Sequence, residues 1–241
     1  MSRAKKNKPT DKAPVTFIDK EPTLAELKYN KIKINFKNER QQEYWDAIDE
    51  NEVIICKGPA GTGKSYIMAA KALDLLCHQK RFDKIIIVRP AVEAEEKLGF
   101  LPGDINEKLD PYVFPTFYLF NKILGERKVN KMKDRGLIQV MALAYMRGVN
   151  IDKAIVIFEE AQNATPRQMK TFLTRLGEDS KYIISGDLDQ SDRYADKTKT
   201  GLHIAFRDLK DKDVNIATVE FDDEHIVRNP LVKVILENLN V

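Results

Sequence analysis

The stretch GPAGTGKS, Gly58–Ser65, follows an apolar run, EVIIC, and precedes a helix-like run, YIMAAKALDLL. Its spacing is that of a phosphate-binding loop, G-x-x-x-x-G-K-[ST]. Glycines let main-chain N–H groups turn toward an anion, and the N-terminus of the following helix adds partial positive charge there. A plain glycine-rich turn is the alternative, but a position between a strand pattern and a helix pattern is the context that a phosphate-binding loop requires.

The loop predicts a nucleoside triphosphate bound together with Mg²⁺. Lys64 would reach the β- and γ-phosphates, and the Ser65 hydroxyl would ligate Mg²⁺. ATP is favoured over GTP because the sequence has no N/T-K-x-D guanine-reading motif after a late strand. The residues expected to contact the nucleotide here are Gly58, Pro59, Ala60, Gly61, Thr62, Gly63, Lys64, Ser65 and Tyr66.

Composition places the chain among ordinary globular proteins. It has 241 residues, 43% hydrophobic and 32% charged, with a net charge of +3 that argues little for a polyanionic partner. No apolar run is long enough to cross a bilayer, and the N-terminus lacks the apolar segment of a secretory signal. Cys56 and Cys77 have no metal-ligand spacing, so we expect core cysteines and a cytoplasmic protein.

Strand and helix patterns alternate along most of the chain. Such alternation predicts an α/β fold, a parallel sheet with helices on both faces. Residues 1–14 read as a basic, disordered tail, and residues 15–241 as a single domain. Strands are expected at 53–56, 84–88, 137–143, 153–160, 181–187 and 214–221, and helices at 37–51, 65–78, 166–176, 201–209 and 231–239.

Two acids, Glu159 and Glu160, end the fourth strand pattern, IVIFEE. Ligands of parallel sheets bind beyond the carboxyl ends of the strands, so we expect both acids near the phosphates. We assign Glu159 to the Mg²⁺ shell, through water, and Glu160 to polarising the attacking water; a solvated strand end is the alternative. The fifth pattern ends in SGDLDQ, which places Asp187 and Gln190 at the same edge, unless that segment is a plain turn.

Several longer segments resemble those of PhoH-type ATPases, in the same order along the chain. The resemblance spans roughly residues 38–238, and the segment after the second strand is far more specific than the phosphate loop. The segments are VRPAVEAEEKLGFLPGDINEKLDPY (Val88–Tyr112), LAYMRG (Leu143–Gly148), EEAQNATPRQMKTFLTRLG (Glu159–Gly177), SGDLDQSD (Ser185–Asp192) and HIVRNPLV (His225–Val232).

The resemblance implies a RecA-like P-loop NTPase domain, similar to the first motor domain of superfamily-one helicases, that couples ATP hydrolysis to single-stranded RNA or DNA. It also implies that Gln41 reads adenine, with Tyr44 stacking nearby, and that Gln190 senses the γ-phosphate. Arg175 and Arg228 are candidates for the arginine that stabilises the transition state. This arginine can come from a neighbouring subunit. Strand movement normally needs two motor sites, so the chain either assembles into a ring or is not a helicase, and we expect a ring-shaped homo-oligomer.

One position departs from the family pattern, which usually has Asp-Glu where this chain has Glu159-Glu160. The extra methylene moves the first carboxylate by roughly 1.5 Å, and Mg²⁺ demands near-ideal geometry. A nucleotide-dependent switch or scaffold with little hydrolysis is therefore the second hypothesis. A kinase for a small molecule is the third, although the Gln190 region and the family segments argue against it.

The family segment after the second strand also holds candidate nucleic-acid contacts, Lys97 and Phe100. They offer a positive charge and a stacking surface, while the acids around them favour a structural loop instead. Four further apolar or aromatic residues are expected to be core rather than stacking platforms. These are Met141, Tyr145, Met146 and Phe172.

Overall fold

The computed structural model describes residues 32–79, 81–90, 105–212, 214–227 and 231–232, with the side chains of residues 105–112 left aside. The predicted tail at 1–14 lies outside these ranges, as does the last predicted helix beyond residue 232. The start of the domain at residue 15 therefore stays a prediction.

Within the described residues, six strands form one sheet in the order β3-β2-β4-β5-β1-β6, and every neighbouring pair is parallel. All six predicted strands are confirmed, with ends that differ by a few residues. Because the strands are parallel, their carboxyl ends share one edge of the sheet. The bounds are β1 (Val53–Lys57), β2 (Lys84–Arg89), β3 (Ile138–Ala142), β4 (Ala154–Phe158), β5 (Lys181–Gly186) and β6 (Ile216–Glu220).

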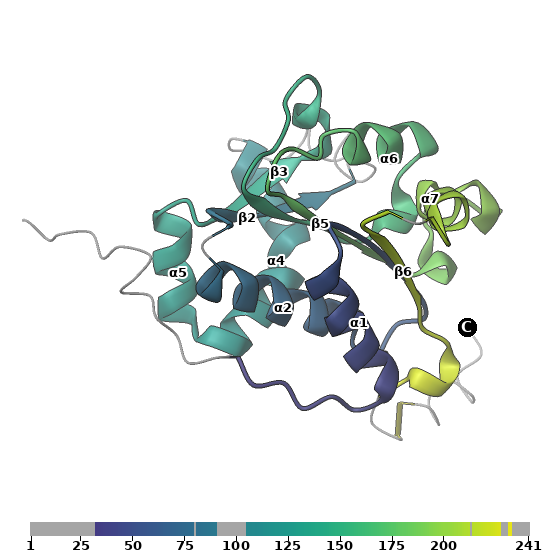
Figure 1. Ribbon diagram of the computed structural model, residues 1–241, viewed down its shortest axis with the longest axis horizontal. Helices are drawn as coiled ribbons and strands as arrows, with labels where there is room; N and C mark the ends of the chain where they lie inside the picture. The colour runs from purple at the N-terminus through teal and green to yellow at the C-terminus, as the bar shows by residue number, and fades with distance from the viewer. Residues whose placement is uncertain (1–31, 80, 91–104, 213, 228–230, 233–241) are drawn as a thin grey trace, which may run out of the picture.

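Helices cover both faces of the sheet, as predicted (Figure 1). Successive strand residues point to opposite faces: Ile54 and Ile85 belong to one core, Ile55 and Ile86 to the other. The first core is covered by α1 (Glu39–Glu50), α2 (Lys64–His78), α4 (Ile105–Leu124) and α5 (Glu126–Asp134), and the second by α6 (Pro166–Leu173) and α7 (Gly201–Leu209). Short 3₁₀ helices complete the described chain: η3 (Leu143–Met146), η4 (Ala161–Asn163), η5 (Leu188–Gln190), η6 (Lys197–Lys199) and η7 (Asp223–His225).

The helices α4 and α5 were not predicted from the sequence. Pro111 and Pro115 lie inside α4, and proline normally interrupts a helix because it lacks an N–H and its ring crowds the preceding turn. Val113, Phe117 and Phe120 are buried in the first core, so packing outweighs the local preference. No helix in the described ranges has the length and apolar character that a membrane crossing needs.

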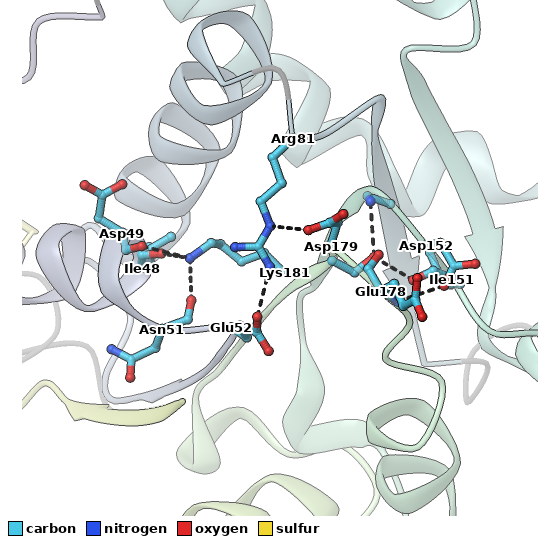
Figure 2. Close-up of polar contacts among 12 residues, drawn as sticks. Ile48, Asp49, Asn51, Glu52, Arg81, Ile151, Asp152, Glu178, Asp179 and Lys181 are labelled. Carbon is cyan, nitrogen blue, oxygen red and sulfur yellow. Dashed lines mark hydrogen bonds and ion pairs between the residues drawn. The ribbon is translucent and has the colours of Figure 1, made fainter. Parts of the chain in front are cut away.

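Lys181, at the start of β5, joins the sheet to the end of α1 (Figure 2). Its buried ammonium donates hydrogen bonds to the main-chain oxygens of Ile48, Asp49 and Asn51. The last carbonyls of a helix have no partners within the helix, so the ammonium satisfies acceptors that burial would otherwise leave unpaired. Burial also lowers the pKa of Lys181 to about 8, against 10.5 for an ordinary lysine.

This shift predicts a pH-dependent contribution of Lys181 to stability. Between about pH 8 and 10.5 the unfolded chain holds the proton more tightly than the folded chain, so the contribution of Lys181 rises with pH across that window. Urea unfolding of the wild type and of Lys181→Met should show the difference in free energy of unfolding moving in favour of the wild type as pH rises. A constant difference would contradict the shift. The other titratable groups are the same in both proteins, so their contributions cancel when the two free energies of unfolding are subtracted.

The prediction that both cysteines are core residues is confirmed for Cys56 and only in part for Cys77. Both are free thiols; Cys56 is buried and Cys77 half-buried. Burial raises the pKa of each thiol to about 12, so little thiolate is present at neutral pH.

Candidate nucleotide-binding site

The loop between β1 and α2 borders a cavity of about 250 Å³ at the carboxyl edge of the sheet. Gly58, Gly61 and Gly63 have φ angles of 146°, 89° and 88°, in the region that favours glycine. A Cβ on Gly58 would lie 2.4 Å from the main-chain oxygen of Phe221, which shows how closely the loop packs on the chain after β6. Six of the nine residues expected to contact the nucleotide line the cavity, namely Ala60, Gly61, Gly63, Lys64, Ser65 and Tyr66. Gly58, Pro59 and Thr62 are not among the lining residues, and nucleotide contact stays a prediction for all nine.

Lys64 lies folded over this loop at the first turn of α2. Its Nζ donates hydrogen bonds of 2.7 Å to the main-chain oxygens of Gly58 and Pro59. The residue is buried and also lines the cavity, so its ammonium is close to any anion that enters. A buried cation beside main-chain N–H groups at a helix N-terminus is an anion-binding arrangement.

The two acids after β4 reach the same cavity but have different surroundings. Glu160 has φ 53° and ψ 35°, a left-handed conformation that turns the chain at the strand end. The side chain of Glu159 is only 5% exposed and that of Glu160 is 50% exposed. Glu159 is therefore a buried carboxylate, and Glu160 is the one that solvent can reach.

Arg89, at the end of β2, forms ion pairs with both acids. Its Nη2 lies 2.9 Å from Oε2 of Glu159, and its Nη1 lies 3.6 Å from Oε1 of Glu160. The hydroxyl of Thr116, from α4, donates a hydrogen bond to the same Oε2 of Glu159. The sequence analysis did not predict that Arg89 pairs with the acids, nor that Thr116 takes part.

Gln162 is a further site residue that the sequence analysis missed. It is wholly buried, and its Nε2 donates to Oε2 of Glu160 at 2.6 Å and to the main-chain oxygen of Gln190 at 3.3 Å. Its Oε1 accepts from the main-chain N of Asp187 at 3.1 Å. The amide therefore joins the ends of β4 and β5, and it fixes the position of Glu160 relative to Gln190, which lines the cavity together with Asp187.

The cavity offers oxygen ligands that suit Mg²⁺. This ion usually takes one or two carboxylates together with phosphate oxygens and waters. Ser65 and Glu159 both line the cavity and would hold the ion, the latter directly or through water. Among the described residues there is no group of three or more His, Cys, Asp or Glu side chains that could hold a metal.

Gln41 braces the loop from the side of α1 and is not among the residues that line the cavity. Its Nε2 donates to the main-chain oxygen of Thr62 at 2.9 Å, and its Oε1 accepts from the main-chain N of Lys37 at 2.9 Å. Tyr44, one turn later, is wholly buried and packs edge-to-face on Phe221. In this structure both side chains support the loop, so adenine reading by Gln41 stays a prediction.

The two candidate arginines have different positions. The main-chain oxygen of Arg175 accepts from the N of Ile151 at 3.0 Å, just before β4 begins, so Arg175 lies at the edge of the sheet opposite the cavity. Arg228 lies outside the described residues. The N of the preceding residue, Val227, donates to the oxygen of Gly61 at 2.9 Å, so the chain reaches the loop immediately before Arg228.

The expected core residues after β3 are buried with one exception. Met146 and Phe172 are wholly buried and Met141 partly so, as predicted. Tyr145, by contrast, is 57% exposed, and the prediction that it is core was wrong. It belongs to η3, a short turn in which Ala144 and Tyr145 are exposed while Leu143 and Met146 are buried. Lys97 and Phe100 lie outside the described residues.

The amino-acid sequence of this chain is similar to those of known proteins. The PhoH-like protein family matches residues 33–240. A PhoH-like protein of Bacillus subtilis (strain 168) is 47% identical over 85% of this chain and 63% of its own length. Protein PhoH of Escherichia coli (strain K12) is 41% identical over 81% of this chain and 55% of its own length. The matched chain thus spans less than two thirds of these relatives.

A solved structure of similar fold is the large terminase of a thermophilic bacteriophage. It has a TM-score of 0.53 and 12% identity, and the match covers 85% of this chain and 50% of that one. At this identity the likeness concerns the fold alone. The fold is that of a P-loop NTPase, similar to the fold of this terminase, and it supports nucleotide binding. By its sequence and by this fold, the chain belongs to the PhoH-like protein family.

Proposed function

We propose that this chain is a Mg²⁺-dependent ATPase whose turnover is coupled to single-stranded nucleic acid, with RNA as the first substrate to test. The observation that carries the proposal is the cavity in which the phosphate loop meets Glu160 and Gln190. A phosphate cradle and a solvent-accessible carboxylate beside it are the parts that hydrolysis of a γ-phosphate requires.

In this proposal each side chain has a distinct task. Main-chain N–H groups of the loop and the Lys64 ammonium bind the phosphates, and Mg²⁺ held by Ser65 and Glu159 would neutralise charge on their oxygens. Glu160 orients a water molecule and accepts its proton. Arg89 lies against both carboxylates and would hold them in position beside the phosphates.

Coupling to nucleic acid and assembly into a ring are part of the proposal. They are supported by membership of the PhoH-like family and by the resemblance to helicase motor domains described above. A neighbouring copy could supply the arginine that the cavity lacks among the described residues. Arg175, on the edge opposite the cavity, would then act on the nucleotide of another copy, whereas Arg228 directly follows a residue bound to the loop.

The deciding experiment is phosphate release from ATP with Mg²⁺, with and without single-stranded RNA. Replacing Glu160 with Gln keeps the shape and removes the proton acceptor, so turnover should fall by about 10²–10⁴-fold while ATP binding is retained. RNA should raise the rate of the wild type only. Equal rates for wild type and variant would overturn the assignment of Glu160, and failure of the wild type to bind ATP would overturn the function.

One contact favours the alternative of a switch or scaffold that binds ATP and hardly hydrolyses it. Oε2 of Glu159 is already engaged by Arg89 and Thr116, which limits how freely this longer carboxylate can meet the metal shell. Tight ATP binding with less than about one turnover per minute, two orders of magnitude or more below typical enzymes, would support this alternative.

A further inference from the structure

A second cavity, of about 230 Å³, lies at the same carboxyl edge of the sheet, beside the nucleotide site but formed by other residues. Its walls come from the turn after β3, from the start of α6 and from the segment after β5. Three of the residues that line it are arginines, Arg147, Arg167 and Arg193, and none of its described lining residues is acidic. We call these three the arginine cleft.

The guanidinium groups of two of the three arginines of this cleft have no polar partner among the described residues, whereas several arginines elsewhere are paired with acids. Arg40, Arg81 and Arg89 each pair with an acid. No hydrogen bond or ion pair joins the guanidinium of Arg147 or Arg167 to another described residue, and both residues are exposed. Two unpaired guanidiniums that converge on one cavity repel each other, so an anion bound between them would be favoured.

The cleft is held in shape by its own polar contacts. Thr165 and Gln168 form a capping box at the start of α6, with bonds of 3.1 and 2.8 Å, which fixes the helix turn that carries Arg167. Oε1 of Gln168 also lies 3.5 Å from Nη1 of Arg193. This order reduces the entropy that ligand binding would otherwise cost.

An exposed aromatic residue lies close in sequence to the arginine cleft. Tyr145 is 57% exposed and lies in η3, two residues before Arg147. Exposed aromatic rings beside a positive groove are how proteins bind single strands, since each base can stack on a ring while the phosphates meet the charges. A free phosphate or an acidic peptide would make no use of the ring.

The cleft and the nucleotide cavity are joined through η4 and the chain after β5. Gln162 bonds Glu160 and the oxygen of Gln190, as described above. The next residue, Asn163, accepts from the main-chain N of Asp192 at 3.0 Å, directly before Arg193. A ligand that binds Arg193 in the cleft therefore contacts the same segment of chain that carries Gln190.

From these observations we infer that the arginine cleft and Tyr145 bind the backbone and a base of single-stranded nucleic acid, and that this contact transmits strand binding to the ATP site. The inference rests on the proposed function and deepens it, because it names the surface through which nucleic acid acts. Discrimination between RNA and DNA is left to the experiment, since both share the phosphodiester that the arginines would bind.

The test is fluorescence anisotropy with labelled oligouridine and oligodeoxythymidine of about 20 nucleotides, longer than one binding site. Arg147→Gln combined with Arg167→Gln should weaken binding about tenfold. The slope of log affinity against log salt should fall by about 1.4, because each phosphate contact to a single strand contributes about 0.7. Tyr145→Ala should weaken binding about fivefold, whereas Tyr145→Phe, which keeps the ring, should not.

The matched control is Arg127→Gln with Lys131→Gln, which removes two exposed charges from α5 on the other face of the sheet. If this control weakens binding as much as the cleft variant, only net charge matters and the inference fails. If the wild type binds strands and the cleft variant binds them equally, the inference fails and the proposed function stands. If the wild type binds neither strand although it hydrolyses ATP, both the coupling and the cleft are overturned.

ATP affinity and basal turnover should be unchanged in the cleft variant, and RNA stimulation should be lost.

Discussion

Replacing Lys64 with Ala is expected to lower ATP turnover by about 10²–10³-fold, the loss seen when one preorganised charge or donor at a transition state is removed. The ammonium lies at the rim of the nucleotide cavity, where it bonds the oxygens of Gly58 and Pro59 at 2.7 Å. Phosphates that enter the loop would take the place of these carbonyls. Alanine removes the charge that faces them and also a hydrogen-bonded brace of the loop, so ATP affinity should fall by about tenfold as well.

The matched control for this prediction is Lys71→Ala. Lys71 is a buried lysine on the same helix, but it pairs with Asp49 at 2.9 Å and packs over the ring of Trp45. Its removal should reduce stability and leave ATP affinity unchanged. ATP affinity is measured with a fluorescent analogue and turnover by phosphate release. If both lysine variants bind ATP as the wild type does, the loop does not hold the phosphates in the way proposed.

Replacing Arg89 with Met is expected to lower the free energy of unfolding by about 3–5 kcal/mol, the usual cost of removing one partner of a buried ion pair. The side chains of Arg89 and Glu159 are 10% and 5% exposed. Without the guanidinium, Glu159 would remain as a buried carboxylate with only the Thr116 hydroxyl to stabilise it. Urea unfolding measures the loss directly, and the exposed Arg81→Met, which breaks pairs with Glu52 and Asp179, should cost less than about 1 kcal/mol.

A double variant separates the charge from the packing. Adding Glu159→Gln to Arg89→Met removes the uncompensated carboxylate, so it should restore a large part of the stability lost in the single variant. Additive losses would show that the pair contributes through packing alone. Neither variant should hydrolyse ATP at the wild-type rate. In Arg89→Met the Glu159 carboxylate loses the partner that positions it, and in the double variant the carboxylate is absent.

The layered sheet could be predicted because its strands are buried on both faces. The buried part of a strand such as KIIIV, its IIIV run, has to be apolar when helices cover both faces of the sheet. Such a run stands out from its polar surroundings. The loop and the two acids could be predicted for a similar reason, since each motif is local and follows a strand. Parallel strands then bring the motifs to one edge without further information.

The helix α4 could not be predicted in the same way. Its two prolines contradict a helix, and only the burial of Val113, Phe117 and Phe120 against the first core outweighs them. Thr116 was missed for this reason, because it reaches Glu159 only if α4 exists. The contact between Arg89 and Glu159 joins two strands that are far apart in sequence, and the role of Gln162 depends on how the ends of β4 and β5 meet. Patterns within one segment carry no signal for such contacts.

The two braces of the phosphate loop have a consequence for the timing of synthesis. One brace comes from Gln41, near the beginning of the described chain, and the other from Val227, near its end. Ribosomes add about 5–20 residues per second, so roughly 10–40 s separate the appearance of the two. During that interval the nascent chain holds the loop from one side only. The phosphate loop therefore gains its second brace only after the segment up to Val227 has been synthesised, and we expect nascent chains that include this segment to bind ATP more tightly than shorter ones.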